Sequence, residues 1–162
     1  MSSPAPPLSL HGKLGSADAV ERLGASIAPR LRAGEALCLF GPLGAGKSTL
    51  ARGLIRALTS PEEDVPSPTF TLVQTYVTPD LVIAHFDLYR LKSPEEAYEI
   101  GLDEALETGA VIIEWPERLD GDLPHDRLDI ALRHDGEGRA AVLTGWGAWT
   151  ARAQDLEPYL HD

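Results

Sequence analysis

Short apolar runs recur along the first two thirds of the chain, and polar or amphipathic segments separate them. Each run has the length of a buried strand, and strands are expected at residues 36–40, 72–77, 81–86 and 110–113. The turn at residues 78–80 suggests that the second and third of these strands form a hairpin. Strands that are apolar on both faces are typical of a parallel sheet covered by helices. The pattern therefore favours an α/β fold.

A first helix is indicated by a cap and an apolar stripe. Ser16 is a good N-cap, and Asp18 in the first turn is favoured by the helix dipole. Apolar residues then recur every three or four positions, and the helix is expected to end near Gly34. The stripe consists of Val20, Leu23, Ile27 and Leu31. A short strand is expected near residues 8–11, and the proline- and serine-rich residues 1–8 are interpreted as a loose arm.

Two further helical regions follow the strands. Residues 47–58 are good helix formers. The segment Ser93-Pro94-Glu95-Glu96 reads as a capping box with proline at the first helical position, which predicts a short helix there. Gly101 interrupts this helix, which is expected to resume at residues 103–108.

The last third of the chain has a different pattern. Apolar residues at 128, 130 and 132 alternate with polar ones, which predicts a half-exposed strand. A turn at residues 134–138 and a return strand at 140–146 complete an antiparallel hairpin. A final helix of about ten residues is expected to carry Trp149, Leu156, Tyr159 and Leu160.

The loop after the strand at residues 36–40 matches a phosphate-binding motif. The fixed positions of G-x-x-x-x-G-K-[ST] are occupied by Gly41, Gly46, Lys47 and Ser48. Glycines let backbone N–H groups turn toward one phosphate, and the following helix directs the positive end of its dipole at it. Lys47 can reach the β- and γ-phosphates, and the Ser48 hydroxyl can ligate Mg²⁺. The motif therefore predicts a nucleotide site.

Together these patterns predict the architecture. We expect a P-loop NTPase-like three-layer sandwich of the α/β class, with a mostly parallel central sheet and a C-terminal antiparallel hairpin extension. A length of 162 residues suits one ordinary domain, so residues 1–162 are expected to form a single ATPase domain.

Two acids follow apolar strands and are candidates for holding a metal and the attacking water. Asp87 comes directly after residues 81–86, and Glu114 after residues 111–113. Ligands of open α/β sheets bind beyond the carboxyl ends of the strands, and hydrolysis needs a carboxylate there to hold Mg²⁺ or its waters. Either acid could instead be a solvated strand end. The sequence leaves open which of the two ligates the metal.

Three other side chains need an interpretation beside these two acids. Thr69 lies in a loop constrained by Pro68, where its hydroxyl could sense the γ-phosphate or complete the Mg²⁺ shell, or could merely start a strand. Trp115 follows Glu114 and could cover the nucleotide or fill the edge of the sheet. His85 is interpreted as a packing residue of its strand.

Charge and composition narrow the class of function. The chain has 25 acidic and 14 basic residues, and its formal net charge is −11. Proteins that bind nucleic acid through its phosphates usually present a basic face, so any such contact is expected to pass through a partner protein. No apolar stretch approaches the roughly 18 residues of a membrane span. No signal-peptide pattern is present, and a cytoplasmic protein is expected.

The absence of one residue type bears on which base the bound nucleotide carries. The chain contains no asparagine, so the guanine-reading N-K-x-D motif cannot occur, and adenine nucleotides are favoured. A small-molecule kinase is the main alternative, although it would need arginines in a lid. The region after Asp87 supplies Arg90 and little else before Arg118. A nucleotide-dependent assembly factor, in which hydrolysis is incidental, is a second alternative.

Four blocks resemble one protein family in their order and spacing. They are Gly41-Pro42-Leu43-Gly44-Ala45-Gly46-Lys47-Ser48-Thr49, Ser67-Pro68-Thr69-Phe70-Thr71-Leu72-Val73, His85-Phe86-Asp87-Leu88-Tyr89-Arg90-Leu91 and Glu114-Trp115-Pro116-Glu117. They resemble the bacterial tRNA threonylcarbamoyladenosine biosynthesis ATPase family, TsaE. The resemblance implies a small cytoplasmic, Mg²⁺-dependent ATP-binding protein with weak ATPase activity. It also implies partners, TsaB and TsaD, which transfer a threonylcarbamoyl group to an adenosine of tRNA. The ATPase would regulate or reset that pair and reach tRNA only through it.

The resemblance also assigns roles by position. The nucleotide-binding residues would be Gly41, Pro42, Leu43, Gly44, Ala45, Gly46, Lys47, Ser48, Thr49 and Trp115. Ser48 and Glu114 would ligate Mg²⁺, and Asp87 and Thr69 would belong to the shell of Mg²⁺ and the γ-phosphate. The chain departs from the family at two positions, since the family usually has aspartate in place of Pro42 and threonine in place of Ser48. Serine keeps the hydroxyl, whereas proline removes a backbone N–H and a carboxylate.

Overall fold

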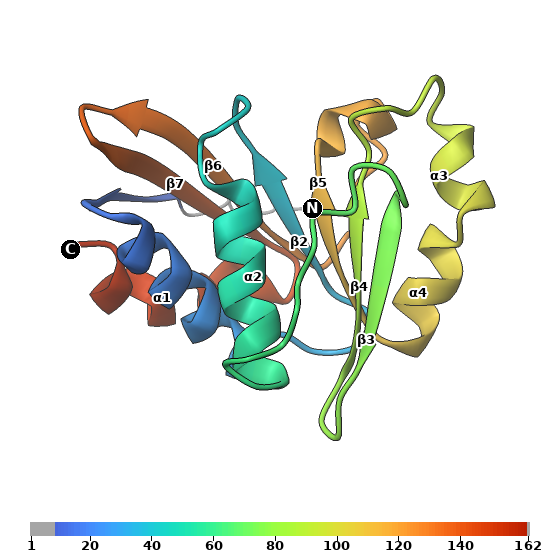
Figure 1. The fold of residues 1–162 in the computed structure, drawn as a ribbon, viewed down its shortest axis with the longest axis horizontal. Coiled ribbons are helices and arrows are strands. Elements are labelled where there is room, and N and C mark those ends of the chain that lie inside the picture. Colours follow the sequence, from blue (N-terminus) through green and yellow to red (C-terminus); the bar gives the residue numbers. More distant parts are fainter. Residues whose placement is uncertain (1–8, 162) are drawn as a thin grey trace, which may run out of the picture.

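The computed structural model describes residues 9–161, and one seven-stranded sheet runs through them (Figure 1). The strands are β1 (Ser9–Leu14), β2 (Ala36–Phe40), β3 (Val73–Val77), β4 (Val82–Asp87), β5 (Ala110–Glu114), β6 (Arg127–Asp135) and β7 (Gly138–Trp146). Their spatial order is β1-β7-β6-β2-β5-β4-β3. The neighbours from β6 through β2 and β5 to β4 are parallel, whereas β1–β7, β6–β7 and β3–β4 are antiparallel. The predicted parallel centre and both predicted hairpins are confirmed.

Helices cover the two faces of the sheet, as Figure 1 shows. One face carries α1 (Ala17–Ile27), α2 (Lys47–Leu58) and α5 (Trp149–Arg152), and the other carries α3 (Glu95–Glu99) and α4 (Leu102–Thr108). Alternate residues of each central strand point to opposite faces. In β2, Leu37 and Leu39 belong to the first core, and Ala36 and Cys38 belong to the second. The expected three-layer sandwich is therefore present.

The first helix begins as predicted but ends earlier. The side chain of Ser16 accepts a hydrogen bond from the backbone N–H of Ala19 at 3.1 Å, so it is the N-cap. The helix stops at Ile27, and residues 28–30 form a 3₁₀ turn. The expected end near Gly34 is wrong because Pro29 has no N–H to continue the ladder and restricts the residue before it.

Two other helix predictions need correction. Ser93 supplies no side-chain cap to α3, which starts at Glu95; the carboxylate of Glu96 instead accepts from the backbone N–H of Lys92 at 2.9 Å. The final helix is not continuous, because α5 is four residues long and a 3₁₀ segment, Ala153–Tyr159, follows it. Pro158 lies inside that segment and is incompatible with a regular α-helical end. The predicted arm at residues 1–8 lies outside the described residues.

Helices α1 and α2 approach each other through glycine. A Cβ atom on Gly24 would lie 2.1 Å from the carbonyl oxygen of Leu50, and one on Gly53 would lie 2.2 Å from that of Glu21. Any larger residue at either position would force the helices apart. This contact fixes the start of α1 beside the glycine loop that precedes α2.

Among residues 9–161, no helix has both the length and the apolar character needed to cross a bilayer. The helices of the described residues are short, and α2 is the longest at 12 residues.

Candidate nucleotide site

The parallel strands bring the two predicted acids together at one end of the sheet. In the register of β2, β5 and β4, Leu39 pairs with Glu114, and Glu114 pairs with Asp87. Paired residues of neighbouring strands point to the same face, so both carboxylates project toward the side that carries α2. A cleft of about 470 Å³ opens there. It lies beyond the carboxyl ends of the strands, where open α/β sheets bind ligands.

The glycine loop forms one wall of this cleft. Gly41, Gly44 and Gly46 all have positive φ angles, of 144°, 79° and 108°. At Gly41 a Cβ atom would also lie 2.5 Å from the carbonyl oxygen of Leu132, so no other residue fits there. The carbonyl of Pro42 accepts a hydrogen bond from the N–H of Ala45 at 3.2 Å and closes a turn. This hydrogen bond and the three positive φ angles define the shape of the loop.

Lys47 lies at the start of α2 and is buried within the loop. Its Nζ donates a hydrogen bond to the carbonyl of Gly41 at 2.6 Å and lies 3.4 Å from the centre of the Trp115 ring. Burial lowers the pKa of the Lys47 ammonium, while nearby carboxylates, Glu114 foremost, raise it. Lys47 lines the cleft, so its ammonium can exchange the carbonyl for a phosphate oxygen.

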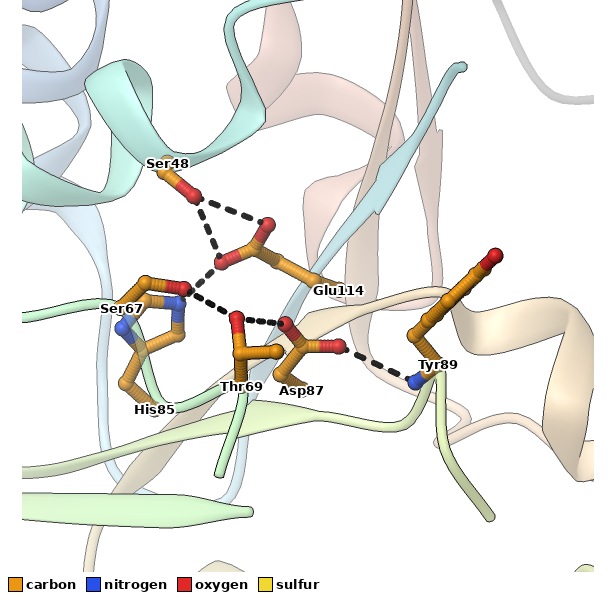
Figure 2. Close-up of polar contacts among 7 residues, drawn as sticks. All are labelled: Ser48, Ser67, Thr69, His85, Asp87, Tyr89 and Glu114. Atoms are coloured by element: carbon orange, nitrogen blue, oxygen red, sulfur yellow. Dashed lines mark hydrogen bonds and ion pairs between the residues drawn. The ribbon is translucent and has the colours of Figure 1, made fainter. Parts of the chain in front are cut away.

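Glu114 connects the loop to the sheet (Figure 2). The hydroxyl of Ser48 lies 3.3 and 3.4 Å from the two oxygens of the Glu114 carboxylate. On its other side, Oε2 lies 2.6 Å from Nε2 of His85. Both His85 and Glu114 are buried, and Nδ1 of His85 has no hydrogen-bond partner. A carboxylate only accepts hydrogen bonds, so Nε2 is the ring nitrogen that donates to Glu114.

Asp87 lies beside Glu114 and binds the loop that precedes β3. Its Oδ2 accepts a hydrogen bond from the Thr69 hydroxyl at 3.4 Å, and its Oδ1 accepts from the backbone N–H of Tyr89 at 3.0 Å. The hydroxyls of Ser67 and Thr69 are 2.8 Å apart. Figure 2 shows these groups converging with Ser48 and Glu114. Thr69 is therefore attached to the site through Asp87.

Trp115 takes the left-handed conformation, with φ 60° and ψ 51°, which is uncommon for a residue other than glycine. This turn places its ring over Lys47 and 4.8 Å from the ring of Tyr89. Residues held in such conformations cluster at functional sites, because the surrounding contacts must offset the strain. Trp115 lines the cleft and also packs against the second core.

The oxygen donors at the cleft suit magnesium. Ser48, Asp87 and Glu114 offer one hydroxyl and two carboxylates, which are hard oxygen ligands. Within residues 9–161 no three Asp, Glu, His or Cys side chains form a metal cage on their own. Mg²⁺ normally keeps several waters and takes one or two carboxylates together with substrate phosphates. The residues present therefore fit Mg²⁺ bound jointly with a nucleotide.

Most of the residues predicted for the site share this cleft. The lining includes Leu43, Gly44, Gly46, Lys47, Ser48, Thr49, Thr69, Asp87, Glu114 and Trp115. Gly41, Pro42 and Ala45 belong to the loop but do not line the cleft. Ser67, the start of α1 and the turn between β6 and β7 complete the walls. The residues from the last two regions are Ser16, Ala17, Val20, Glu137, Gly138 and Arg139.

Two residues with close contacts at the site were not predicted. His85 was interpreted as a packing residue, yet strand alternation places it on the same face as Asp87, two positions later, and that periodicity was a usable signal. Arg139 donates hydrogen bonds to the carbonyl oxygens of Ala45 and Gly44, both at 3.0 Å. No local sequence pattern predicts this contact, because 94 positions separate Arg139 from Ala45.

Comparisons with known proteins identify the family. The family described as threonylcarbamoyl adenosine biosynthesis protein TsaE matches residues 14–141. The protein named tRNA threonylcarbamoyladenosine biosynthesis protein TsaE from Rickettsia bellii is 40% identical over 120 residues, 74% of this chain and 83% of that protein. Its namesake from Treponema pallidum is 37% identical over 128 residues, 78% of this chain and 93% of that protein. The crystal structure of YdiB from Bacillus subtilis has the same fold, with a TM-score of 0.77, 24% identity and coverage of 96% of this chain and 99% of that chain. This chain belongs to the TsaE family.

Proposed function

We propose that this protein binds ATP and Mg²⁺, hydrolyses ATP slowly, and serves the formation of threonylcarbamoyladenosine in tRNA. The observation that carries the proposal is the placement of the Ser48 hydroxyl against the Glu114 carboxylate, with Lys47 in the adjoining glycine loop. In the proposal, the loop would hold the phosphates and the adjoining Ser48 and Glu114 would hold the metal that accompanies them. The relatives named for threonylcarbamoyladenosine biosynthesis supply the biological setting.

The chain's own residues suggest how hydrolysis would proceed. Backbone N–H groups at the start of α2 and the Lys47 ammonium would hold the β- and γ-phosphates. Ser48 and Glu114 would hold Mg²⁺, which neutralises charge as the γ-phosphoryl group leaves. Asp87, oriented by Thr69 and the N–H of Tyr89, would orient the attacking water. Water would then form the new P–O bond as the bond to ADP breaks, and its proton would pass to an oxygen of the phosphate product.

The cations of the cleft support slow turnover by the isolated protein. Among the described residues that line it, the basic side chains are Lys47 and Arg139. Three donors of Arg139 are engaged with backbone carbonyls, those of Gly44, Ala45 and Gly138. Fast phosphoryl transfer commonly needs a further arginine, which can come from a partner. We therefore infer that the TsaB–TsaD pair stimulates hydrolysis, and that the acidic chain meets tRNA only through that pair.

The test is ATP turnover by the purified protein, alone and with purified TsaB and TsaD, with and without Mg²⁺. The expected result is slow, Mg²⁺-dependent phosphate release that increases when the pair is added. Phosphate transfer to a metabolite, with no response to the pair, would establish a small-molecule kinase instead. Binding of ATP without any turnover would leave a nucleotide-dependent assembly factor.

A further inference from the structure

Arg139 makes a contact between the C-terminal hairpin and the glycine loop. It is the second residue of β7, and Figure 1 shows the β6–β7 turn at the same end of the sheet as the loop between β2 and α2. Its guanidinium donates from Nε to the carbonyl of Ala45 and from Nη2 to the carbonyl of Gly44, each at 3.0 Å. A third donor, Nη1, bonds the carbonyl of Gly138 at 2.8 Å. One planar group thus holds two successive peptides of the loop.

Among the described residues, no carboxylate forms an ion pair with this guanidinium. The ion pairs within residues 9–161 do not include Arg139, although the protein is strongly acidic. The hydrogen-bond partners of the guanidinium are therefore backbone carbonyls, two of them in the glycine loop. Hydrogen bonds from a charged donor are stronger than those between neutral groups, and the fork of an arginine adds directional control.

Because peptide groups are planar, hydrogen bonds to these two carbonyls also restrict the direction of the N–H groups that follow them. In a planar trans peptide the C=O of one residue and the N–H of the next point in opposite directions. Holding the carbonyl of Ala45 therefore fixes the N–H of Gly46. Holding the carbonyl of Gly44 helps to fix the N–H of Ala45, which also donates to the carbonyl of Pro42 at 3.2 Å. Gly44 and Gly46, the glycines on either side of Ala45, both have positive φ angles. Without restraint, these flexible positions would sample many peptide orientations.

We propose that Arg139 is a positioning residue that preorganises the glycine loop for a polyphosphate chain. The inference rests on the proposed nucleotide binding and assigns to the C-terminal hairpin a part in it. Ordering the loop before the ligand arrives removes an entropic cost from binding. The benefit depends on the phosphates and not on the base, so Arg139 should matter equally for ATP and for inorganic tripolyphosphate.

The test compares wild type, Arg139→Gln and Arg139→Lys with the control Arg133→Gln. Arg133 is exposed on the neighbouring strand β6, and the control makes the same change of charge. Two quantities are measured: hydrogen exchange of the amides of residues 44–47 in the free protein, and the affinities for Mg²⁺–ATP and Mg²⁺–tripolyphosphate by calorimetry. Thermal unfolding checks the fold, and Arg139→Lys, which keeps the charge but not the fork, carries the test if the glutamine variant does not fold.

The expected result is exchange faster by about tenfold in the Arg139 variants, with both affinities reduced by a similar factor, about tenfold. The control should match wild type. Unchanged exchange, or faster exchange with unchanged affinities, would overturn the inference. A loss of affinity for ATP alone would also overturn it, because Arg139 would then contact the nucleoside. If wild type binds neither ligand, the proposed function itself fails.

Discussion

A buried glutamate lies at each end of the parallel strands, and the two glutamates differ in their hydrogen-bond partners. At the amino end, Glu35 precedes β2, and its Oε1 accepts hydrogen bonds from Arg152 at 2.6 Å, Trp149 at 3.0 Å and the N–H of Arg32 at 3.0 Å. At the carboxyl end, Glu114 has His85 on one side and only the longer contacts of Ser48 on the other.

Burial alone does not separate these two residues, since 5% of Glu35 and 3% of Glu114 is exposed. The difference lies in the donors. Glu35 is paired with a permanent cation and two N–H groups, so its charge is already compensated. Glu114 faces the cleft. Its contacts with the Ser48 hydroxyl are long enough that a ligand could displace them. A buried carboxylate whose hydrogen-bonding capacity is filled by the protein indicates a role in the fold. A buried carboxylate with a weakly held partner that a ligand could displace indicates a binding site.

The comparison predicts its largest effect at Glu114. Glu114→Gln should lower ATP turnover at least about a hundredfold, because the metal loses a charged ligand in a step where it supplies several kcal/mol. The amide keeps the shape of the side chain, so the free energy of unfolding in urea should stay within about 1 kcal/mol. Turnover within threefold of wild type would remove Glu114 from the site.

At Glu35 the same substitution should act on stability. Glu35→Gln leaves the Arg152 guanidinium with a neutral partner in a largely buried position and should cost about 3 kcal/mol of unfolding free energy. The turnover of the folded fraction should not change. Glu21→Gln is the matched control, since its pairing with Arg56 is far more exposed and should cost no more than about 1 kcal/mol. Equal losses in the two variants would contradict the distinction.

A smaller effect is expected at His85. His85→Leu removes the hydrogen bond that orients Glu114, and such supporting residues typically change metal affinity by about 10- to 100-fold. Turnover should therefore need more Mg²⁺, whereas ATP affinity without Mg²⁺ should be unchanged. His85→Gln, which can still donate, should recover much of the Mg²⁺ affinity. If leucine and glutamine behave alike, the histidine merely packs in the sheet.

Ser48→Thr should have the smallest effect. Threonine retains the hydroxyl that lies against Glu114, so turnover should stay within about threefold of wild type. Ser48→Ala lacks that oxygen and should instead approach the loss expected for Glu114→Gln. Similar activities in the alanine and threonine variants would show that the hydroxyl does not ligate the metal.

Local patterns were sufficient to predict most of the fold. Apolar runs and the glycine motif fix strand, loop and helix within a few residues, and parallel pairing explains why Asp87 and Glu114 could be placed together. Prolines explain the two helices whose ends were predicted wrongly. Pro29 follows the end of α1, and Pro158 lies inside the 3₁₀ segment that follows α5. Proline was a visible signal in each case, but the apolar periodicity outweighed it.

The remaining features of the site depend on contacts across the fold. His85 reaches Glu114 from a neighbouring strand, and Arg139 reaches the loop from 94 positions away. A histidine within an apolar strand, or an arginine beside a turn, has many ordinary explanations in sequence. Only the pairing of β4 with β5, and of β6 with both β2 and β7, brings these side chains to the cleft.

The glycine contacts between α1 and α2 have a mechanical consequence. Because the backbones touch at Gly24 and Gly53, no compressible layer of side chains lies between the helices at these points. The start of α1 lines the same cleft as the start of α2, through Ser16, Ala17 and Val20. If a bound phosphate chain displaces α2, we expect α1 to move with it. Since α1 also packs against the C-terminal 3₁₀ segment, such a movement would reach a part of the chain that does not line the cleft.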